Sequence, residues 1–532
     1  MPALTTALDP ASDTARANRE AMLGHLDGIE ELLAKARAGG GERYVERHRQ
    51  RGKLPARDRV ELLLDRDSPF LELMPLAAAE TDFHPGASIV CGIGVVEGVE
   101  CVVSANDPTV RGGTLNPYGF RKVLRGQEIA FQNRLPYISL VESGGADLPT
   151  QAEAFIPGGQ AFRDLSRLSA AGIPTIAIVF GSSTAGGAYM PGMSDYNIFV
   201  KERAKVFLGG PPLVKMATGE ESGEEELGGA EMHSRVSGLS DYMAADEEDG
   251  IRLGREVVRR LNWRKQGPGP TEAPDDPLHD AEDIVAIPSS DLRVPFDPRE
   301  ILARTLDGSR YDEFKPLYGS ALTTGWGSIH GYPVGVLANA RGTLFSEEAQ
   351  KAAQFIQLAN QKDVPLVFLH NATGFMVGRE YEQGGIIKHG ALMINAVSNS
   401  KVPHLGVIVG GSYGAANYAM SGRAYAPRLL FAWPNAKIAV MGPKQLAGVL
   451  SIVARAGSEA RGQEFDEDAD AKLRAGVEDQ IEREQTALAN TSRLYDDGII
   501  DPRDTRTVLG LALSVVDNAP VAGVRGYGVY RM

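Results

Sequence analysis

The sequence predicts an α/β protein in which two related domains follow each other along the chain. Segments about 230 positions apart resemble each other in the same order, and within each copy helix-like segments alternate with short, continuous apolar runs. Solenoid repeats have periods of 20–50 residues, so a period this long indicates that each copy is a whole domain.

The repeat rests on segments whose separation hardly changes. LPYISLVESGG contains Pro136 and VPLVFLHNATG contains Pro365, which are 229 positions apart. Pro174 in GIPTIAIVFGSSTAGGAY and Pro403 in KVPHLGVIVGGSYGAANY have the same separation. Elsewhere the separation shifts only to 232 or 233. Several matches in one order at a nearly constant offset favour an internal duplication over two generic helix–strand segments.

Each expected element follows from local periodicity. Apolar residues recur every three to four positions over residues 16–38, 117–134 and 346–362, which predicts helices. The runs YISLV, TIAIVF, LVFL and LGVIV are apolar throughout, as is typical of strands covered on both faces. We expect an acidic helix over residues 466–489 and a proline-rich linker between the copies. The predicted domains are 1–270, with its N-terminal helices, and 293–532, joined by a linker over 271–292.

Composition excludes several classes of protein. The chain has 532 residues, 55 Lys+Arg and 69 Asp+Glu, so its net charge of −14 disfavours a nucleic-acid-binding protein. Two cysteines cannot form a disulfide framework or a four-cysteine zinc site. Glycine is abundant, with 61 residues against a usual share of about 7%. Many backbone positions therefore need to be free of a side chain.

The N-terminal segment and the apolar runs indicate no targeting signal or membrane span. MPALTTALDPASDTARANRE lacks a basic region followed by an apolar core. The most apolar stretches are far shorter than the roughly 20 residues that cross a bilayer. We expect a cytoplasmic protein without a membrane partner.

Two matched turns are the main candidates for chemistry. Ala185, Gly186, Gly187, Ala188 and Tyr189 follow one predicted strand. Under the 229 offset they match GAANY, which follows the equivalent strand of the second copy. Unpaired amides at a strand-to-helix turn can stabilise an anion, and small residues let a ligand approach them. The pair therefore predicts two oxyanion sites built from main chain.

Other sequence patterns give weaker evidence of a catalytic or metal-binding site. GSSTAG does not have the spacing of a GxSxG nucleophile elbow, and no GxxxxGK[ST] phosphate loop occurs. The histidines lack metal-ligand spacing, so we expect His233, His370 and His389 to be hydrogen-bonded structural residues. Val214, Lys215 and Met216 are interpreted as a loop.

The long motifs resemble a known family. SSTAGGAYMPGMSD, FLGGPPLVKMATGEE, HNATGFMVGREYE and GGSYGAANYAMSGRAYAPRLLFAWPNAKIAVMG are similar to the carboxyltransferase (β) subunits of biotin-dependent acyl-CoA carboxylases. They are most similar to the 3-methylcrotonyl-CoA branch, and the resemblance covers nearly the whole chain. It implies two tandem crotonase-like domains.

The resemblance also implies roles for the two turns. Amides of Gly186 and Gly187 would hold the enolate oxygen of the acyl-CoA thioester, with Ala185, Ala188, Tyr189 and Arg111 on the substrate side. Amides of Ala415 and Ala416 would hold the ureido oxygen of biotin, with Gly374, Phe375, Tyr413 and Gly414 around it. Carboxybiotin would supply CO2 and then a base for the substrate proton, so no side-chain base would be needed. Arg121, Lys122 and Arg125 are further candidates for the CoA phosphates, or else surface charges.

The implied partners complete the prediction. The chain has no ATP-grasp-like region and no AMKM-type biotinylation site. The resemblance therefore implies a separate biotinylated subunit that uses ATP, no metal in this chain, and a homohexamer (a dimer of trimers) with each active site between two chains.

The sequence does not decide which acyl-CoA is the substrate. The methylcrotonyl pattern is GSYGAGNYGM, whereas this chain has GSYGAANYAM, with Ala416 and Ala419 in place of glycines. Their methyl groups could narrow the biotin side or shift the acyl preference towards propionyl-, acetyl- or geranyl-CoA. A decarboxylase or hydratase acting on acyl-CoA and a non-catalytic scaffold subunit are the alternative functions.

Overall fold

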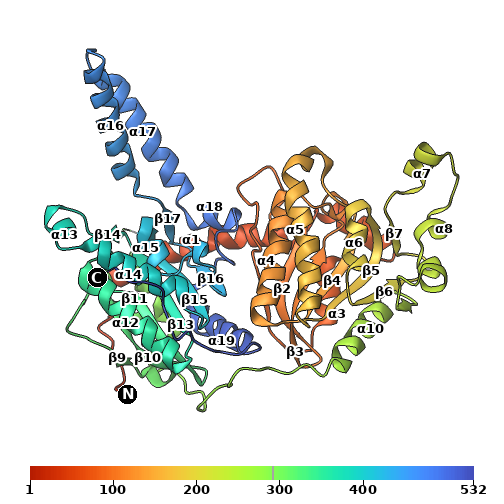
Figure 1. Cartoon of the computed structure of the whole chain (residues 1–532), viewed down its shortest axis with the longest axis horizontal. Coiled ribbons are helices and arrows are strands. Elements are labelled where there is room, and N and C mark those ends of the chain that lie inside the picture. Colours follow the sequence, from red (N-terminus) through yellow and green to blue (C-terminus); the bar gives the residue numbers. More distant parts are fainter. Residues whose placement is uncertain (290, 292, 532) are drawn as a thin grey trace.

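The computed structural model describes residues 1–289, 291 and 293–531, and it contains two large sheets, each with its own helices (Figure 1). Positions 290 and 292, at the end of the predicted linker, lie outside the described residues. Figure 1 shows the two sheets in separate lobes that are joined by a long extended segment. No described helix is long and apolar enough to cross a membrane.

The first sheet is mixed, with its long central strands buried. Its order is β1-β2-β3-β4-β5-β6-β8, and β7 pairs with the end of β5. β2 and β3 are antiparallel, whereas β3 to β6 run parallel. The strands are β1 (Phe70–Glu72), β2 (Ile89–Val96), β3 (Val99–Asn106), β4 (Tyr137–Ser143), β5 (Thr175–Thr184), β6 (Tyr196–Val200), β7 (Lys205–Phe207) and β8 (Tyr242–Ala244). Helices α4 (Pro117–Asn133), α5 (Gln151–Ala170) and α10 (Glu247–Arg260) pack on it.

The second sheet has the same plan. Its order is β16-β15-β13-β11-β10-β9, and β17 pairs with the end of β15. The strands are β9 (Asp312–Glu313), β10 (Leu322–Ile329), β11 (Tyr332–Asn339), β13 (Leu366–Ala372), β15 (His404–Tyr413), β16 (Leu429–Ala432) and β17 (Lys437–Ala439). The helices α12 (Ser346–Lys362) and α14 (Ile386–Asn399) pack against each other beside it.

Equivalent elements keep the predicted offset. α4 and α12 begin at 117 and 346, β4 and β13 at 137 and 366, and β5 and β15 at 175 and 404, a difference of 229 in each case. Side-chain contacts repeat as well. Lys122 Nζ donates to the carbonyl of Ile89 at 2.7 Å, and Lys351 Nζ donates to that of Leu322 at 2.8 Å. The predicted helices at 117–134 and 346–362 and the four apolar strands are confirmed.

Two predictions outside the repeat need correction. Val214, Lys215 and Met216 lie in helix α7 (Pro211–Thr218), because Pro211 and Pro212 suit the first turn of a helix. The acidic stretch forms α17 (Glu467–Glu484) and then breaks before α18 (Ala487–Ser492).

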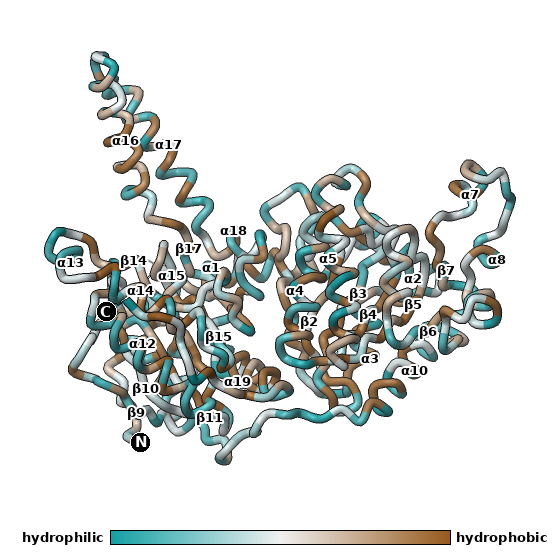
Figure 2. The backbone as a smooth tube through the Cα atoms, in the orientation of Figure 1, coloured by the Kyte–Doolittle hydropathy of each residue, from teal (hydrophilic) through white to brown (hydrophobic). Residues whose placement is uncertain are grey.

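A helical hairpin projects from the second lobe. α16 (Pro443–Ala460) and α17 extend away from the body, and α16 carries apolar residues along its length (Figures 1 and 2). Ile452 and Val453 on α16 are largely exposed.

A buried aspartate joins the two lobes. Asp497, after α18, accepts two hydrogen bonds of 2.8 Å from Arg125 on α4 and one of 3.0 Å from Arg423, which follows the second turn. Burial alone would raise the pKa of Asp497, but Arg125 and Arg423 outweigh it and lower that pKa to about 2. The neighbouring Asp496 is also fully buried, and burial and the charge of Asp497 raise its pKa to about 7.

We predict that Asp496 makes stability depend on pH. Its folded-state pKa lies above the unfolded value of about 4, so its contribution to stability is present in acid and is lost as pH rises through 7. Asp496→Asn should therefore raise Tm relative to the unmodified protein at pH 8 and by much less at pH 5.5. Calorimetry at the two pH values tests this, with the exposed Asp468→Asn as control. A Tm difference that does not change with pH would contradict the assignment.

Candidate functional site

The two strand-to-helix turns share an unusual backbone conformation. Ala185 begins the short helix η3 (Ala185–Ala188) after β5, and Gly414 begins α15 (Gly414–Ala419) after β15. Their φ angles are 55° and 51°, in the left-handed region. For alanine this costs about 1 kcal/mol. A left-handed residue at the same repeat position in both lobes turns the chain sharply from strand into helix.

The amides of the first turn border open space. A methyl group placed on Gly186 would meet only Phe162, at 3.6 Å, and one on Gly187 would meet Ser183 Oγ at 3.5 Å and Gly145 Cα at 3.8 Å. Ser183 Oγ donates to the Gly187 carbonyl at 2.9 Å, which fixes the turn on the end of β5.

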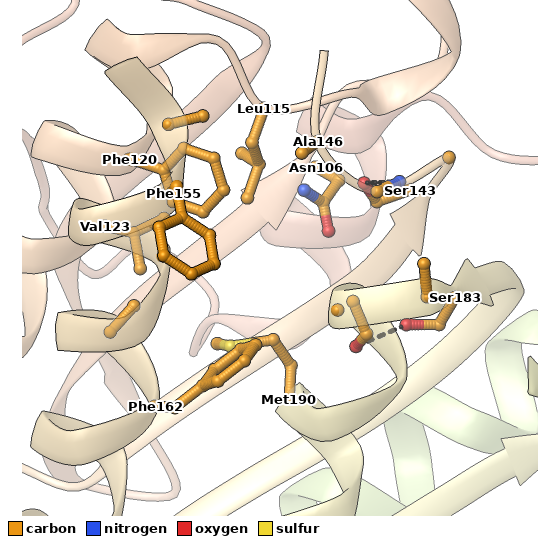
Figure 3. Close-up of a pocket in the computed structure, with 18 of the residues that line it drawn as sticks. Asn106, Leu115, Phe120, Val123, Ser143, Ala146, Phe155, Phe162, Ser183 and Met190 are labelled. Atoms are coloured by element: carbon orange, nitrogen blue, oxygen red, sulfur yellow. Dashed lines mark hydrogen bonds between the residues drawn. The ribbon is translucent and has the colours of Figure 1, made fainter. Parts of the chain in front are cut away.

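A large apolar cavity opens beside this turn. Its volume is about 1030 Å³, and its walls come from the ends of β3, β4 and β5 and from α4 and α5. Figure 3 shows Phe120, Val123 and Phe155 grouped on one side, and Ser143 and Ser183 on the other. Gly186 and Gly187 line it as well. None of the described residues that line the cavity has an ionisable side chain.

The carboxylate next to the cavity, that of Glu142, is bound in ion pairs within the protein. Glu142 precedes the lining residue Ser143 and forms ion pairs with Lys53 and, at 2.7 Å, with Arg59. Burial opposes ionisation, but Arg59 and Lys53 outweigh it and hold the pKa of Glu142 below its usual range. Glu142 therefore stays charged and bound, which does not suit a general base.

The equivalent space in the second lobe is filled by an aromatic ring. Phe375 occupies the repeat position of Ala146, which lines the cavity in the first lobe. Phe375 packs against Leu344, Ala372 and Ala416, and a methyl on Gly390 would lie 3.4 Å from its ring. The Phe375 ring therefore takes up space beside the second turn that Ala146 leaves free beside the first.

The two departures from the expected glycine pattern are accommodated inside the protein. Ala416 and Ala419 are both fully buried, the first against Phe375 and the second in the core of the second lobe. Whether these methyl groups affect the biotin side or the acyl preference stays a prediction. Ala416 lies in α15 with φ outside the left-handed region, so its amide keeps a helical orientation.

Several of the remaining predicted residues lie at or near the two turns and the cavity. Arg111 is mostly exposed and pairs at 3.4 Å with Asp147, which lies between the cavity residues Ala146 and Leu148. Tyr189 and Tyr418 occupy equivalent positions, each 42% exposed. Gly374 pairs with Thr343 beside the second turn.

Other candidate side chains are already bound within the protein. The Tyr413 hydroxyl donates to Gln485 at 2.8 Å. Lys122 and Arg125 are buried and bound internally, so they are not surface charges that CoA could reach.

Sequence reasoning missed the cavity itself. Its walls depend on small residues at Ala154, Gly158 and Ala161 of α5. Their spacing places them on one face of the helix, but small residues alone do not distinguish close packing from a cavity. Of the histidines, His233 and His370 are hydrogen-bonded as expected. Nδ1 of His389 has no partner among the described residues.

The site is a hollow, apolar cavity bordered by the main chain of a turn, and none of the described residues that line it is ionisable. It suits the binding of an acyl group and the stabilisation of negative charge that develops on it.

Comparisons with known proteins identify the family. The carboxyl transferase domain matches residues 47–525. A probable biotin-dependent acyl-coenzyme A carboxylase beta2 subunit of Mycobacterium tuberculosis is 66% identical, over 99% of this chain and 100% of that protein. The 3-methylcrotonyl-coenzyme A carboxylase beta1 subunit of the same organism is 50% identical, over 94% and 95%. The Pseudomonas aeruginosa geranyl-CoA carboxylase beta subunit has a TM-score of 0.91 at 44% identity, covering 99% of each chain.

The chain therefore belongs to the carboxyl transferase family, as a β-type subunit of a biotin-dependent acyl-CoA carboxylase.

We predict that the aromatic ring which closes the second lobe is important for stability. Phe375→Ala should lower the free energy of unfolding by about 3 kcal/mol, because truncating a packed Phe leaves a void. Ala146→Phe, the reverse change at the equivalent position, should cost less because its ring enters existing space. Denaturant unfolding of both variants checks this. An equal loss of stability in Ala146→Phe would show that the first lobe has no free space for the ring.

Proposed function

We propose that this chain transfers a carboxyl group from carboxybiotin, carried by a partner subunit, to an acyl-CoA. The substrate is 3-methylcrotonyl-CoA or a related branched or unsaturated acyl-CoA. One observation carries the proposal: an apolar cavity without ionisable side chains meets a turn of open amides at Gly186 and Gly187. Such a site can stabilise an enolate oxygen, and it leaves the base to come from elsewhere.

On the acyl side, the backbone performs the chemistry. The amides of Gly186 and Gly187 donate to the thioester oxygen as it gains charge when the substrate loses its proton. In 3-methylcrotonyl-CoA this proton leaves the γ-carbon, because the double bond carries the charge to the thioester oxygen. The cavity holds the acyl chain away from water, and Arg111 at its edge offers a positive charge to CoA.

On the biotin side, the second turn fits a small polar ring system. Ala415 is exposed, and the Ala416 methyl packs against Phe375. A methyl on Gly374 would meet open space. The amides of Ala415 and Ala416 would hold the ureido oxygen, with Gly374, Phe375, Tyr413 and Gly414 beside them. When bound, carboxybiotin supplies CO2 and a base for the substrate proton.

The architecture supports three further parts of the proposal. The repeated elements and contacts support two crotonase-like domains that arose by duplication, over 1–270 and 293–532. A biotinylated subunit would use the ATP, with no metal in this chain. Exposed apolar residues at the cavity mouth and on α16 support a homohexamer in which each active site combines two chains: Leu148, Phe155, Ile156, Ile452 and Val453.

The cavity has room for a larger acyl group within this substrate class. Each heavy atom takes roughly the 30 Å³ of a water molecule, so five carbons fill about a seventh of the space and ten carbons about a third. Gly158 helps to keep the cavity open, because a methyl there would already touch the Phe120 ring at 3.4 Å. A branched acyl group of about ten carbons, as in geranyl-CoA, therefore fits as well as 3-methylcrotonyl-CoA.

We predict that a side chain at the first turn stops catalysis. Gly187→Val should lower kcat more than tenfold, about 1.4 kcal/mol of barrier, because its methyl groups crowd the amides. The assay is ATP- and bicarbonate-dependent carboxylation with the biotinylated partner. Gly192→Val, where the added Cβ meets open space, is the control and should keep its activity. Retention of activity by Gly187→Val would remove the oxyanion assignment.

We predict that Gly158 sets the acyl length. Gly158→Phe should lower kcat/KM for geranyl-CoA at least 100-fold but change that for 3-methylcrotonyl-CoA less than tenfold. The reason is that each lost methylene site is worth 10–200-fold in an apolar pocket. Arg167→Phe, on the exposed part of α5, controls for the added ring. Equal losses on both substrates would show that Gly158 does not limit chain length. Propionyl- and acetyl-CoA complete the panel.

A further inference from the structure

The second turn is held by a chain of buried polar groups behind it. Ser412 Oγ, two residues before Gly414, accepts a hydrogen bond of 2.8 Å from Asn417 Nδ2 in α15. The same hydroxyl lies 3.1 Å from Nδ1 of His370 on the neighbouring strand β13. His370 and Ser412 are both fully buried. This His370–Ser412–Asn417 chain links the sheet directly to the helix that carries Ala415 and Ala416.

The first lobe does not have this chain. Val141 and Ala188 stand at the repeat positions of His370 and Asn417, and only the serine is kept, as Ser183. Ser183 donates instead to the Gly187 carbonyl at 2.9 Å. The two turns therefore have the same backbone form but are braced by different chemistry.

The hydrogen bonds of the chain are compatible with a neutral His370. The Ser412 oxygen accepts the Asn417 amide hydrogen. Between Ser412 and Nδ1 of His370, either atom can donate, depending on the tautomer of the imidazole. Burial lowers the pKa of His370 to about 3, against a smaller contribution from the main chain of Met420. The imidazole therefore stays neutral at physiological pH.

The Asn417 side chain also packs closely against Gly422. A methyl on Gly422 would overlap Asn417 Oδ1, and the Gly422 amide donates to the main-chain carbonyl of Asn417 at 2.8 Å. A side chain at position 422 would therefore displace the Asn417 carboxamide, so the glycine keeps the space that the hydrogen bond to Ser412 needs.

We propose that His370, Ser412 and Asn417 are positioning residues that orient the Ala415 and Ala416 amides towards the biotin oxygen. This rests on the proposed function. The acyl ligand is enclosed by its cavity, whereas Phe375 fills the equivalent space of the second lobe. The biotin-side turn therefore needs its orientation from the protein behind it. The chain supplies that orientation without touching the ligand.

The test replaces His370 and Asn417 by the residues of the first lobe and also removes the Ser412 hydroxyl. Asn417→Ala, His370→Val and Ser412→Ala each break the chain, and each should lower kcat/KM for the biotinylated partner 10- to 100-fold. KM for the acyl-CoA should stay within about twofold, because the first turn is unaffected. His370→Asn should restore much of the loss, since its Oδ1 can accept the Ser412 hydrogen in place of Nδ1.

Two controls separate positioning from stability. Ser421→Ala breaks another buried Ser–His bond of the same lobe, 2.9 Å long to His404, which is separate from the hydrogen bonds that link His370, Ser412 and Asn417. It should lower Tm as Ser412→Ala does and leave both KM values unchanged. Ser183→Ala should give the reverse pattern, with the loss on the acyl-CoA side.

The outcomes distinguish the two proposals. An unmodified protein that carboxylates no acyl-CoA with a biotin-loaded partner would refute the proposed function. An active protein in which Ser412→Ala and Ser421→Ala behave alike would refute the positioning role alone. Failure of His370→Asn to recover activity above His370→Val would also overturn it.

Discussion

The buried charge of Asp497 is a polar link between the two lobes, set in an apolar core that both lobes share. Its carboxylate binds Arg125 of α4, a helix that also lines the proposed acyl cavity, and Arg423, which follows the turn proposed for biotin. It also accepts the Leu430 amide of β16 at 2.9 Å. Removing one partner of such a buried pair typically costs 3–5 kcal/mol, because the remaining charge is left in a medium that cannot solvate it. Helix α4 of the first lobe and the segment that follows the second turn are thus both bound to one buried carboxylate.

The two lobes show how one fold can serve two ligands. Strand order, offset, lysine contacts and the left-handed residue before the helix are the same in both. Most side chains differ between the two copies, and two of the differences bear on the proposed roles of the lobes. Ala146 lines a cavity where Phe375 places a ring, and Val141 is apolar where His370 joins a polar chain. Apolar filling and polar bracing are both local changes that leave the sheet intact.

Much of this could be predicted from the sequence, and the remainder had physical reasons to stay hidden. Continuous apolar strands and a constant offset define the sheets because buried strands tolerate little else. The burial of Lys122 and Arg125 was not visible, since a charge paired with carbonyls or carboxylates across the fold looks like a surface charge in the sequence. Helix α7 was interpreted as a loop because its eight residues are too few for a clear period. The cavity was missed since a void leaves no residue of its own.

A site made of main chain also explains why the alanines of the second turn are tolerable. An amide is supplied by every residue except proline, so the donor itself does not depend on the side chain. What varies is the direction in which a side chain leaves the turn. At Ala416 the methyl packs against Phe375, whereas at Gly187 a larger side chain would enter the cavity. Which substitutions each turn can accept therefore depends on what surrounds the amide, because every residue except proline supplies the amide itself.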